Sequence, residues 1–289
     1  MLDDIIRTKN IFPSIILVLI VVVLTGYYNQ IEISKIICAI SICTLILFYN
    51  KISSLIRSLF IVNILFTSSL VLVDFHTINN SILMAKFIIL LAFLAERYFY
   101  MINGRFIFIE VTLLVFLALL CYPPTIFYIL FIYCLILFHS IKKFSTWVLP
   151  LFCLFIFTMV AFGISFLLDF NLLNYLQNQL SHFQLVYYDF TPKQLYLLIS
   201  LIFFSILALV DHYRIGFKQS THNKKNYELI LYLLIISSLL FLLSKNAILF
   251  VIFPCSIMIS KYIFYRKNKW IRWFMILYFP VSALIWSVI

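Results

Sequence analysis

Long apolar runs separated by short polar segments follow one another along the whole chain. Each run is close to the roughly 20 residues that a helix needs to cross a bilayer. The pattern predicts an all-α, polytopic transmembrane bundle of about eleven spans, forming a single integral membrane domain over residues 1–289. The expected spans are 11–26, 33–49, 55–73, 80–96, 106–121, 124–139, 146–168, 195–211, 227–244, 246–261 and 271–288.

The region 106–139 is one apolar stretch whose interior is interrupted only by Pro123 and Pro124. We expect two crossings with a turn at Cys121–Pro124, because a single crossing would place every later basic loop on the outside. Each arm has about 16 residues and would be about 24 Å long, which is less than the usual hydrocarbon thickness. A re-entrant pair of helices therefore remains the alternative.

Residues 169–194 form the longest polar segment on the expected outer side and have a different pattern. Leucines recur there at steps of three and four residues with polar side chains between them, which predicts an amphipathic helix lying in the outer interface. Pro192 then ends the segment. Two interpretations stay open: a connector on the lipid headgroups, or a lid over an outer-facing cavity with His182 and Asp189 as its titratable groups.

Composition agrees with a membrane protein and excludes several other classes. Of the 289 residues, 65% are hydrophobic and only 11% are charged, whereas a soluble domain is about one-quarter charged. A soluble enzyme, a disordered chain and a fibrous repeat are therefore excluded. The spans leave only short loops, so we expect no soluble domain.

The net charge of +11 is explained by the placement of the bases. With the N-terminus in the cytoplasm, 17 of the 21 Lys and Arg residues fall in cytoplasmic segments. This asymmetry is the positive-inside pattern of short membrane loops. The excess charge therefore encodes topology, and we expect the lipid bilayer, not nucleic acid, as the partner.

Familiar catalytic and cofactor motifs are missing from the sequence. There is no phosphate-cradling glycine loop, no HExxH and no GxSxG. The six cysteines form no CxxC and have no histidine at ligand spacing. We therefore expect no cofactor and no metal site, and search instead for ionisable residues in costly positions.

One polar cluster lies at the outer boundary between the third and fourth expected spans. Asp74 and His76 stand in the loop, and Lys86 lies about a turn and a half into the following span. Asp74 and Lys86 can pair across the hairpin as a structural contact. Alternatively, Lys86 faces a substrate, with Asp74 and His76 as catalytic candidates.

Glu110 is the second intramembrane charge, about one turn into the fifth expected span from the cytoplasmic side. A carboxylate near a helix end can reach the interface or pair with Arg97 or Arg105. The functional interpretation is a proton or cation site beside the broken 106–139 hairpin. Glu110, Lys86 and His182 are thus the substrate-binding candidates, and Asp74, His76 and Asp189 are the catalytic ones.

Three stretches give the chain a resemblance to a known family: the hairpin sequence Phe106–Pro124, the segment Lys142–Pro150, and Phe253–Trp270 with its basic turn. It resembles an uncharacterised family of multi-pass inner-membrane proteins from Gram-negative bacteria, catalogued as a domain of unknown function. The resemblance implies an inner-membrane helical bundle, with Glu110 in the place of an acidic residue common in that hairpin. It implies no reaction.

Three functions fit these observations. The first is envelope assembly at the outer face, where a lipid or lipid-linked glycan is handled with Asp74 or Asp189 as a base and Lys86 or Lys193 as a cation for phosphate. The second is a transporter or flippase, favoured by the broken hairpin and by Glu110 and Lys86. The third is a non-enzymatic scaffold that binds a membrane-protein partner. The sequence does not decide whether the protein is an enzyme.

Overall fold

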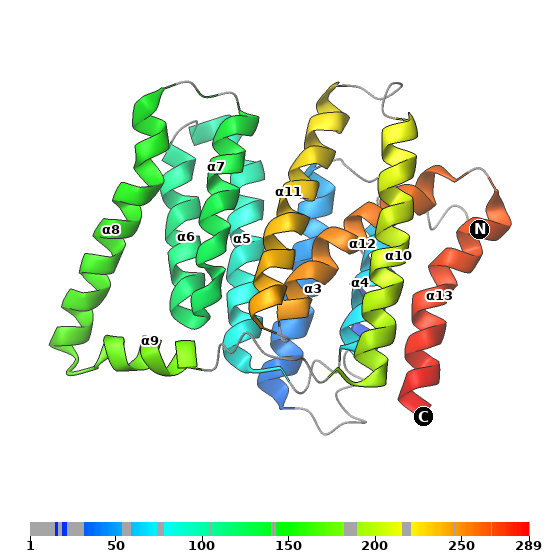
Figure 1. Cartoon of the computed structure of the whole chain (residues 1–289), viewed down its shortest axis with the longest axis horizontal. Helices are drawn as coiled ribbons and strands as arrows, with labels where there is room; N and C mark the ends of the chain where they lie inside the picture. Colours follow the sequence, from blue (N-terminus) through cyan, green and yellow to red (C-terminus); the bar gives the residue numbers. More distant parts are fainter. Residues whose placement is uncertain are drawn as a thin grey trace.

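The computed structural model describes most of the chain as α-helices (Figure 1). The described residues are 15–16, 19–21, 32–53, 59–73, 78–103, 106–139, 141, 143–181, 190–215, 221–244, 247–266 and 268–288. The principal elements are α3 (Ile33–Ser53), α4 (Leu59–Leu72), α5 (Asn80–Asn103), α6 (Ile107–Cys121), η3 (Pro123–Phe127), α7 (Tyr128–Phe138), α8 (Phe144–Leu167), α9 (Leu172–Ser181), α10 (Pro192–Ile215), α11 (Thr221–Leu243), α12 (Ile248–Tyr265) and α13 (Lys269–Val288).

The predicted all-α class is confirmed, and helices α3 to α8 and α10 to α13 coincide with the predicted apolar runs. Among the described residues, four helices are long and apolar enough to cross a membrane, namely α8, Pro192–Arg214 of α10, Asn226–Leu243 of α11, and α12. Several shorter apolar helices accompany them, including α6. The expected first span, 11–26, lies mostly outside the described residues.

The predicted break in the 106–139 region lies where the two prolines stand. Helix α6 ends at Cys121, and Tyr122 is extended, with φ −150° and ψ 97°. Pro123 and Pro124 then open the short 3-10 helix η3, because proline lacks the amide that would continue α6 and disfavours helical backbone before it. The chain reverses here, so that α6 and α7 run antiparallel (Figure 1).

Helix α12 forms the centre of the larger part of the bundle. Its side chains are buried over nearly the whole length, and it packs against α4, α10 and α11. Helix α8 stands at the opposite edge against α6 and α7 (Figure 1). Most of its apolar side chains are exposed, among them Leu151, Phe152 and Phe155. Such an apolar outer surface suits lipid contact.

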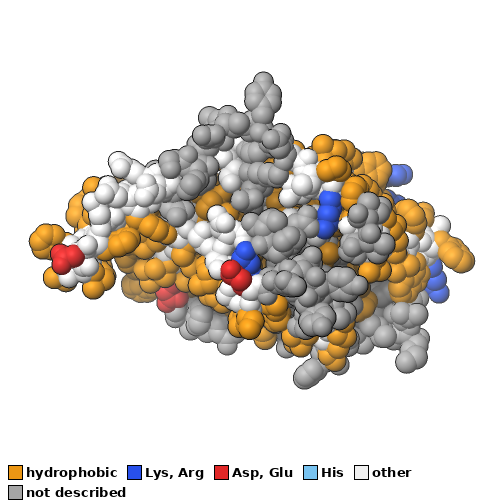
Figure 2. Space-filling model, turned by 90° about the horizontal axis from the view of Figure 1, so that it is seen from below, with side chains coloured by type: hydrophobic (Ala, Val, Ile, Leu, Met, Phe, Trp, Pro, Cys, Tyr) orange, Lys and Arg blue, Asp and Glu red, His pale blue; other side chains and the backbone are white. Residues whose placement is uncertain are grey.

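Helix α9 lies across the end of the bundle that also carries η3, hereafter the η3 end (Figure 1). Asp169 adopts the left-handed conformation, with φ 49°, in the turn between α8 and α9. The Asn171 side-chain oxygen accepts the Asn174 amide at 3.0 Å, which caps the start of α9. The predicted helix within 169–194 is therefore present. Figure 2 views this end of the molecule and shows mostly hydrophobic side chains with few charges among the described residues.

Candidate functional site

Lys86 is the most unusual charged side chain in the described part of the bundle. It lies in α5 and is completely buried. Its Nζ has no hydrogen-bond partner among the described residues. The ammonium position is 5.1 Å from the ring centre of Phe250 and 4.8 Å from that of Phe253, both in α12. Lys86 therefore projects from one helix into the aromatic interior of the bundle.

Further aromatic rings surround this pair of phenylalanines. Tyr122 stacks on Phe250 at 6.1 Å between ring centres, and Tyr128 lies 5.9 Å from the same ring. The Tyr128 hydroxyl is 3.0 Å from that of Ser237 in α11. Four elements, α5, α7, α11 and α12, are thereby joined around Lys86, together with the residue that precedes η3.

The aromatic rings alone do not offset the burial of the ammonium. A desolvated cation–π contact contributes about 2 kcal/mol, whereas taking an ammonium out of water costs several kcal/mol even after relaxation. An anionic group is the partner that satisfies such a cation. Asp74, the predicted structural partner, lies outside the described residues. The site is suited chemically to binding an anion.

A second buried ionisable site lies further along α5, and it consists of two residues, Glu96 and His139. The Glu96 side chain is 3% exposed, and its Oε1 is 2.9 Å from Nε2 of His139. His139 follows α7 directly, so this contact joins α5 to the end of α7. A buried carboxylate next to an imidazole can share or exchange a proton.

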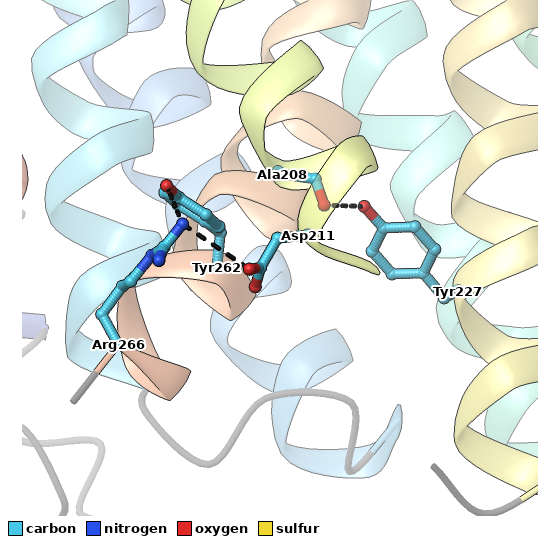
Figure 3. Close-up of polar contacts among 5 residues, drawn as sticks. All are labelled: Ala208, Asp211, Tyr227, Tyr262 and Arg266. Atoms are coloured by element: carbon cyan, nitrogen blue, oxygen red, sulfur yellow. Dashed lines mark hydrogen bonds and ion pairs between the residues drawn. The ribbon is translucent and has the colours of Figure 1, made fainter. Parts of the chain in front are cut away.

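A third polar group lies where the ends of α10 and α12 meet the start of α11 (Figure 3). The Arg266 guanidinium contacts the Tyr262 hydroxyl and lies 3.5 Å from Oδ1 of Asp211. The Tyr227 hydroxyl donates to the Ala208 carbonyl at 3.4 Å. These contacts join the ends of three helices to one another.

His212 and Lys261 complete this third group. The His212 ring stacks on Tyr227 with 3.6 Å between ring centres, and Lys261 Nζ lies 4.5 Å from the centre of the same tyrosine ring. The cations therefore lie on aromatic rings instead of pointing at a shared empty position. This arrangement fits a structural role for the group, with Arg266 and Asp211 as its ion pair.

The predicted site residues are only partly described by the structure. Lys86 lies in the bundle interior, as a substrate-facing residue would. Glu110 is exposed on α6 and makes no ion pair with a described residue. The other four candidates lie outside the described residues: Asp74, His76, His182 and Asp189.

Sequence reasoning missed Glu96, which is the deeply buried carboxylate of this region. Glu96 is the last residue of the expected span 80–96, a position that predicts the end of a helix at the membrane boundary. Helix α5 instead continues to Asn103, which places Glu96 within the helix. The sequence signal that could have identified Glu96 is a possible partner, His139, at the end of the hairpin that packs beside α5.

Two apolar or mixed hollows accompany these polar groups. A groove of about 370 Å³ lies between α4 and α13 and is lined by residues such as Ile64, Val71 and Leu284. A more open hollow of about 550 Å³ lies at the corner of α8 and α9, where Ser165, Asp169 and Asn171 contribute polar groups. The first suits a hydrocarbon chain, and the second suits a polar headgroup.

Comparison with known proteins gives one finding for the whole chain. A model of a family of unknown function matches residues 1–289. No curated protein and no solved structure gives a significant match. The geometry described above is therefore the basis for a functional conclusion.

Proposed function

Because the whole chain belongs to the family of unknown function DUF6427, we propose a function from the site itself: the protein is a membrane transporter or flippase for an anionic substrate, with Lys86 as its substrate-binding cation. The observation that carries this proposal is the complete burial of Lys86, whose Nζ lacks a hydrogen-bond partner among the described residues. An ionisable residue held within a membrane bundle commonly marks a substrate or ion pathway.

We propose further that the chain crosses a bacterial inner membrane about eleven times, with its N-terminus in the cytoplasm. The η3 end then faces outward, and the end with Arg266 and Lys261 faces the cytoplasm. The basic residues of the latter end support this orientation. Amphipathic α9 supports it as well, because such a helix is stable in the outer interface.

Lys86 and helix α12 together supply a physical basis for transport. Pro254 removes the amide that would donate to the Phe250 carbonyl, so α12 is weakened beside the ring that contacts Lys86. Interrupted helices at the depth of a substrate site are common in transporters. Binding of an anion would offset the ammonium charge and so favour a state other than the one in which Lys86 is completely buried.

The apolar groove between α4 and α13 supports a lipid as the substrate. Its two hydroxyl side chains, Thr67 and Ser68, donate to carbonyls of their own helix, so the wall offers no unsatisfied hydroxyl donor. A hydrocarbon chain fits such a wall. An anionic phospholipid combines this chain with the negative headgroup that Lys86 requires.

The test is lipid translocation in liposomes that contain the purified protein. We expect fluorescent phosphatidylglycerol to cross faster than in protein-free liposomes and faster than fluorescent phosphatidylcholine. Lys86→Met should reduce the rate for phosphatidylglycerol at least tenfold, whereas Lys224→Met, which changes an exposed lysine of α11, should leave it unchanged. Equal rates in wild-type and protein-free liposomes would contradict the proposal.

A second candidate function is the handling of lipid-linked glycan at the outer face. The hollow at the α8–α9 corner favours it, because Asp169 and Asn171 lie there beside apolar side chains. In that case Asp74→Asn or Asp189→Asn should abolish glycan transfer in membranes that contain the protein. Retention of transfer in both variants would exclude these carboxylates as its catalytic base.

A further inference from the structure

We propose that Glu96 and His139 form a proton-binding site, and that this site takes up the proton that is coupled to transport. The coupling rests on the proposed transport function, whereas proton binding by the pair does not.

The local geometry favours a shared proton. Glu96 Oε1 and His139 Nε2 are 2.9 Å apart, and their side chains are 3% and 12% exposed. The rings of Phe108 and Phe138 lie 6.5 and 5.1 Å from the His139 ring. Histidine is the side chain that ordinarily changes charge between about pH 5 and 8. A carboxylate beside it in apolar surroundings makes each group's protonation depend on the other's.

The position of the pair connects it to Lys86. Both sites include a residue of α5, ten positions apart, which is about 15 Å along a helix. Phe93 lies between them, with its ring 6.2 Å from Phe253 and 4.6 Å from Phe131. Phe253 is the ring that Lys86 contacts, and Phe131 belongs to α7, the helix that precedes His139. Aromatic packing therefore extends from the Lys86 site to α7, the helix that ends beside the Glu96–His139 pair.

Glu96 is more deeply buried than the described charged side chains of the helices that pack around the pair. Helices α3, α6 and α8 pack against α5 or α7, and α11 packs against α7. The described side chains of charged residues on or directly preceding these four helices are all at least partly exposed: Glu32, Lys35, Glu110, Lys143, Lys224 and Glu228. Glu96, at 2% exposure of the whole residue, differs from all of them.

The direct test is infrared difference spectroscopy of the full chain in lipid bilayers as the pH is lowered from about 8 to about 5. We expect a change in the carboxylate stretching bands that appears in the wild type and is lost in Glu96→Gln, which keeps a hydrogen bond to His139. Glu110→Gln, the matched control on the exposed face of α6, should keep the change. His139→Gln should move the pH at which the change appears.

Identical difference spectra in wild type and Glu96→Gln would overturn the proton site. The coupling is tested separately with fluorescent phosphatidylglycerol in liposomes that carry a pH gradient. We expect the gradient to change the wild-type rate several-fold and to have no effect on Glu96→Gln. A Glu96 band change without any wild-type translocation would contradict the transport function and leave proton binding intact. Translocation that ignores the gradient would overturn the coupling.

Discussion

A buried ammonium raises the free energy of the folded state unless an opposite charge or a set of acceptors offsets it. Lys86 has two phenylalanine rings beside it and no hydrogen-bond acceptor among the described residues. A residue that served packing alone would be replaced without loss by an apolar side chain of similar length. We infer that Lys86 is kept for what it binds.

Replacement of Lys86 by methionine tests that inference through stability. We expect Lys86→Met to raise the Tm of the purified protein by a few degrees, because methionine avoids the several kcal/mol that it costs to take an ammonium out of water. Thermal unfolding in lipid nanodiscs measures this. A lower Tm would instead indicate that Lys86 is structurally paired, with Asp74 as the predicted partner, since loss of one member strands the other.

The Tyr128 hydroxyl offers a second test at the level of single residues. Its contact with Ser237, at 3.0 Å between hydroxyl oxygens, joins α7 to α11 beside the Lys86 site. Tyr128→Phe should lower the free energy of unfolding by about 1–3 kcal/mol, because the Ser237 hydroxyl is left buried and unsatisfied. Adding Ser237→Ala to Tyr128→Phe should lower the free energy of unfolding little further. A double-mutant cycle in mixed micelles measures this. Additive losses would show that the two hydroxyls do not interact.

At the scale of elements, the sequence predicted most helices and missed how far some of them extend. Runs of apolar residues predict helices well in a membrane protein, because every backbone group must be satisfied within the helix. The same patterns do not predict how far a helix continues into polar residues beyond the end of its apolar run. Helix α5 reaches Asn103, well beyond the predicted end at residue 96, so Glu96 is about two turns from the end of the helix.

The candidate site was predictable only in part for a related reason. Lys86 was recognisable because one charge inside an apolar run is rare. Its neighbours Phe250 and Phe253 come from a helix more than 160 positions away, and nothing in their local sequence distinguishes them from other apolar positions. Tertiary packing, which a single sequence does not record, creates the aromatic surroundings.

Helix α12 provides the test at this scale. Pro254→Ala returns an amide that can donate to the Phe250 carbonyl, so we expect a higher Tm and slower lipid translocation from a stiffer helix. Pro150→Ala in α8, a helix at the edge of the bundle, is the matched control. It should leave the translocation rate unchanged. Equal effects of the two substitutions on the rate would argue against a special role for the α12 proline.

At the scale of the whole molecule, successive helices run in opposite directions, so the segments that connect them lie at two ends of the bundle. Helix α9 and η3 lie at one end, and the start of α11 lies at the other (Figure 1). Lys86 lies six residues, less than two turns, from the η3 end of α5, and Glu96 lies nearer the opposite end. In the proposed orientation, an anion that enters from outside would meet Lys86 first, and the proton site would lie toward the cytoplasm.

Thiol labelling tests this orientation. In a background with the six native cysteines replaced, we expect a membrane-impermeant maleimide added outside the cell to label Asn178→Cys in α9. Lys224→Cys at the start of α11 should react only after the membrane is permeabilised. Both positions are exposed, so access to each depends on the side of the membrane. Labelling of Lys224→Cys in intact cells would reverse the proposed topology.

The central claim is that the fully buried position of Lys86 opens to a substrate during function. The most direct measurement is the reaction of Lys86→Cys, in the same cysteine-free background, with a small charged methanethiosulfonate added outside. We predict complete modification at a rate much slower than that of the exposed Asn178→Cys. If Lys86→Cys stays unmodified while Asn178→Cys reacts fully, the position does not open, and the proposed transport function is wrong.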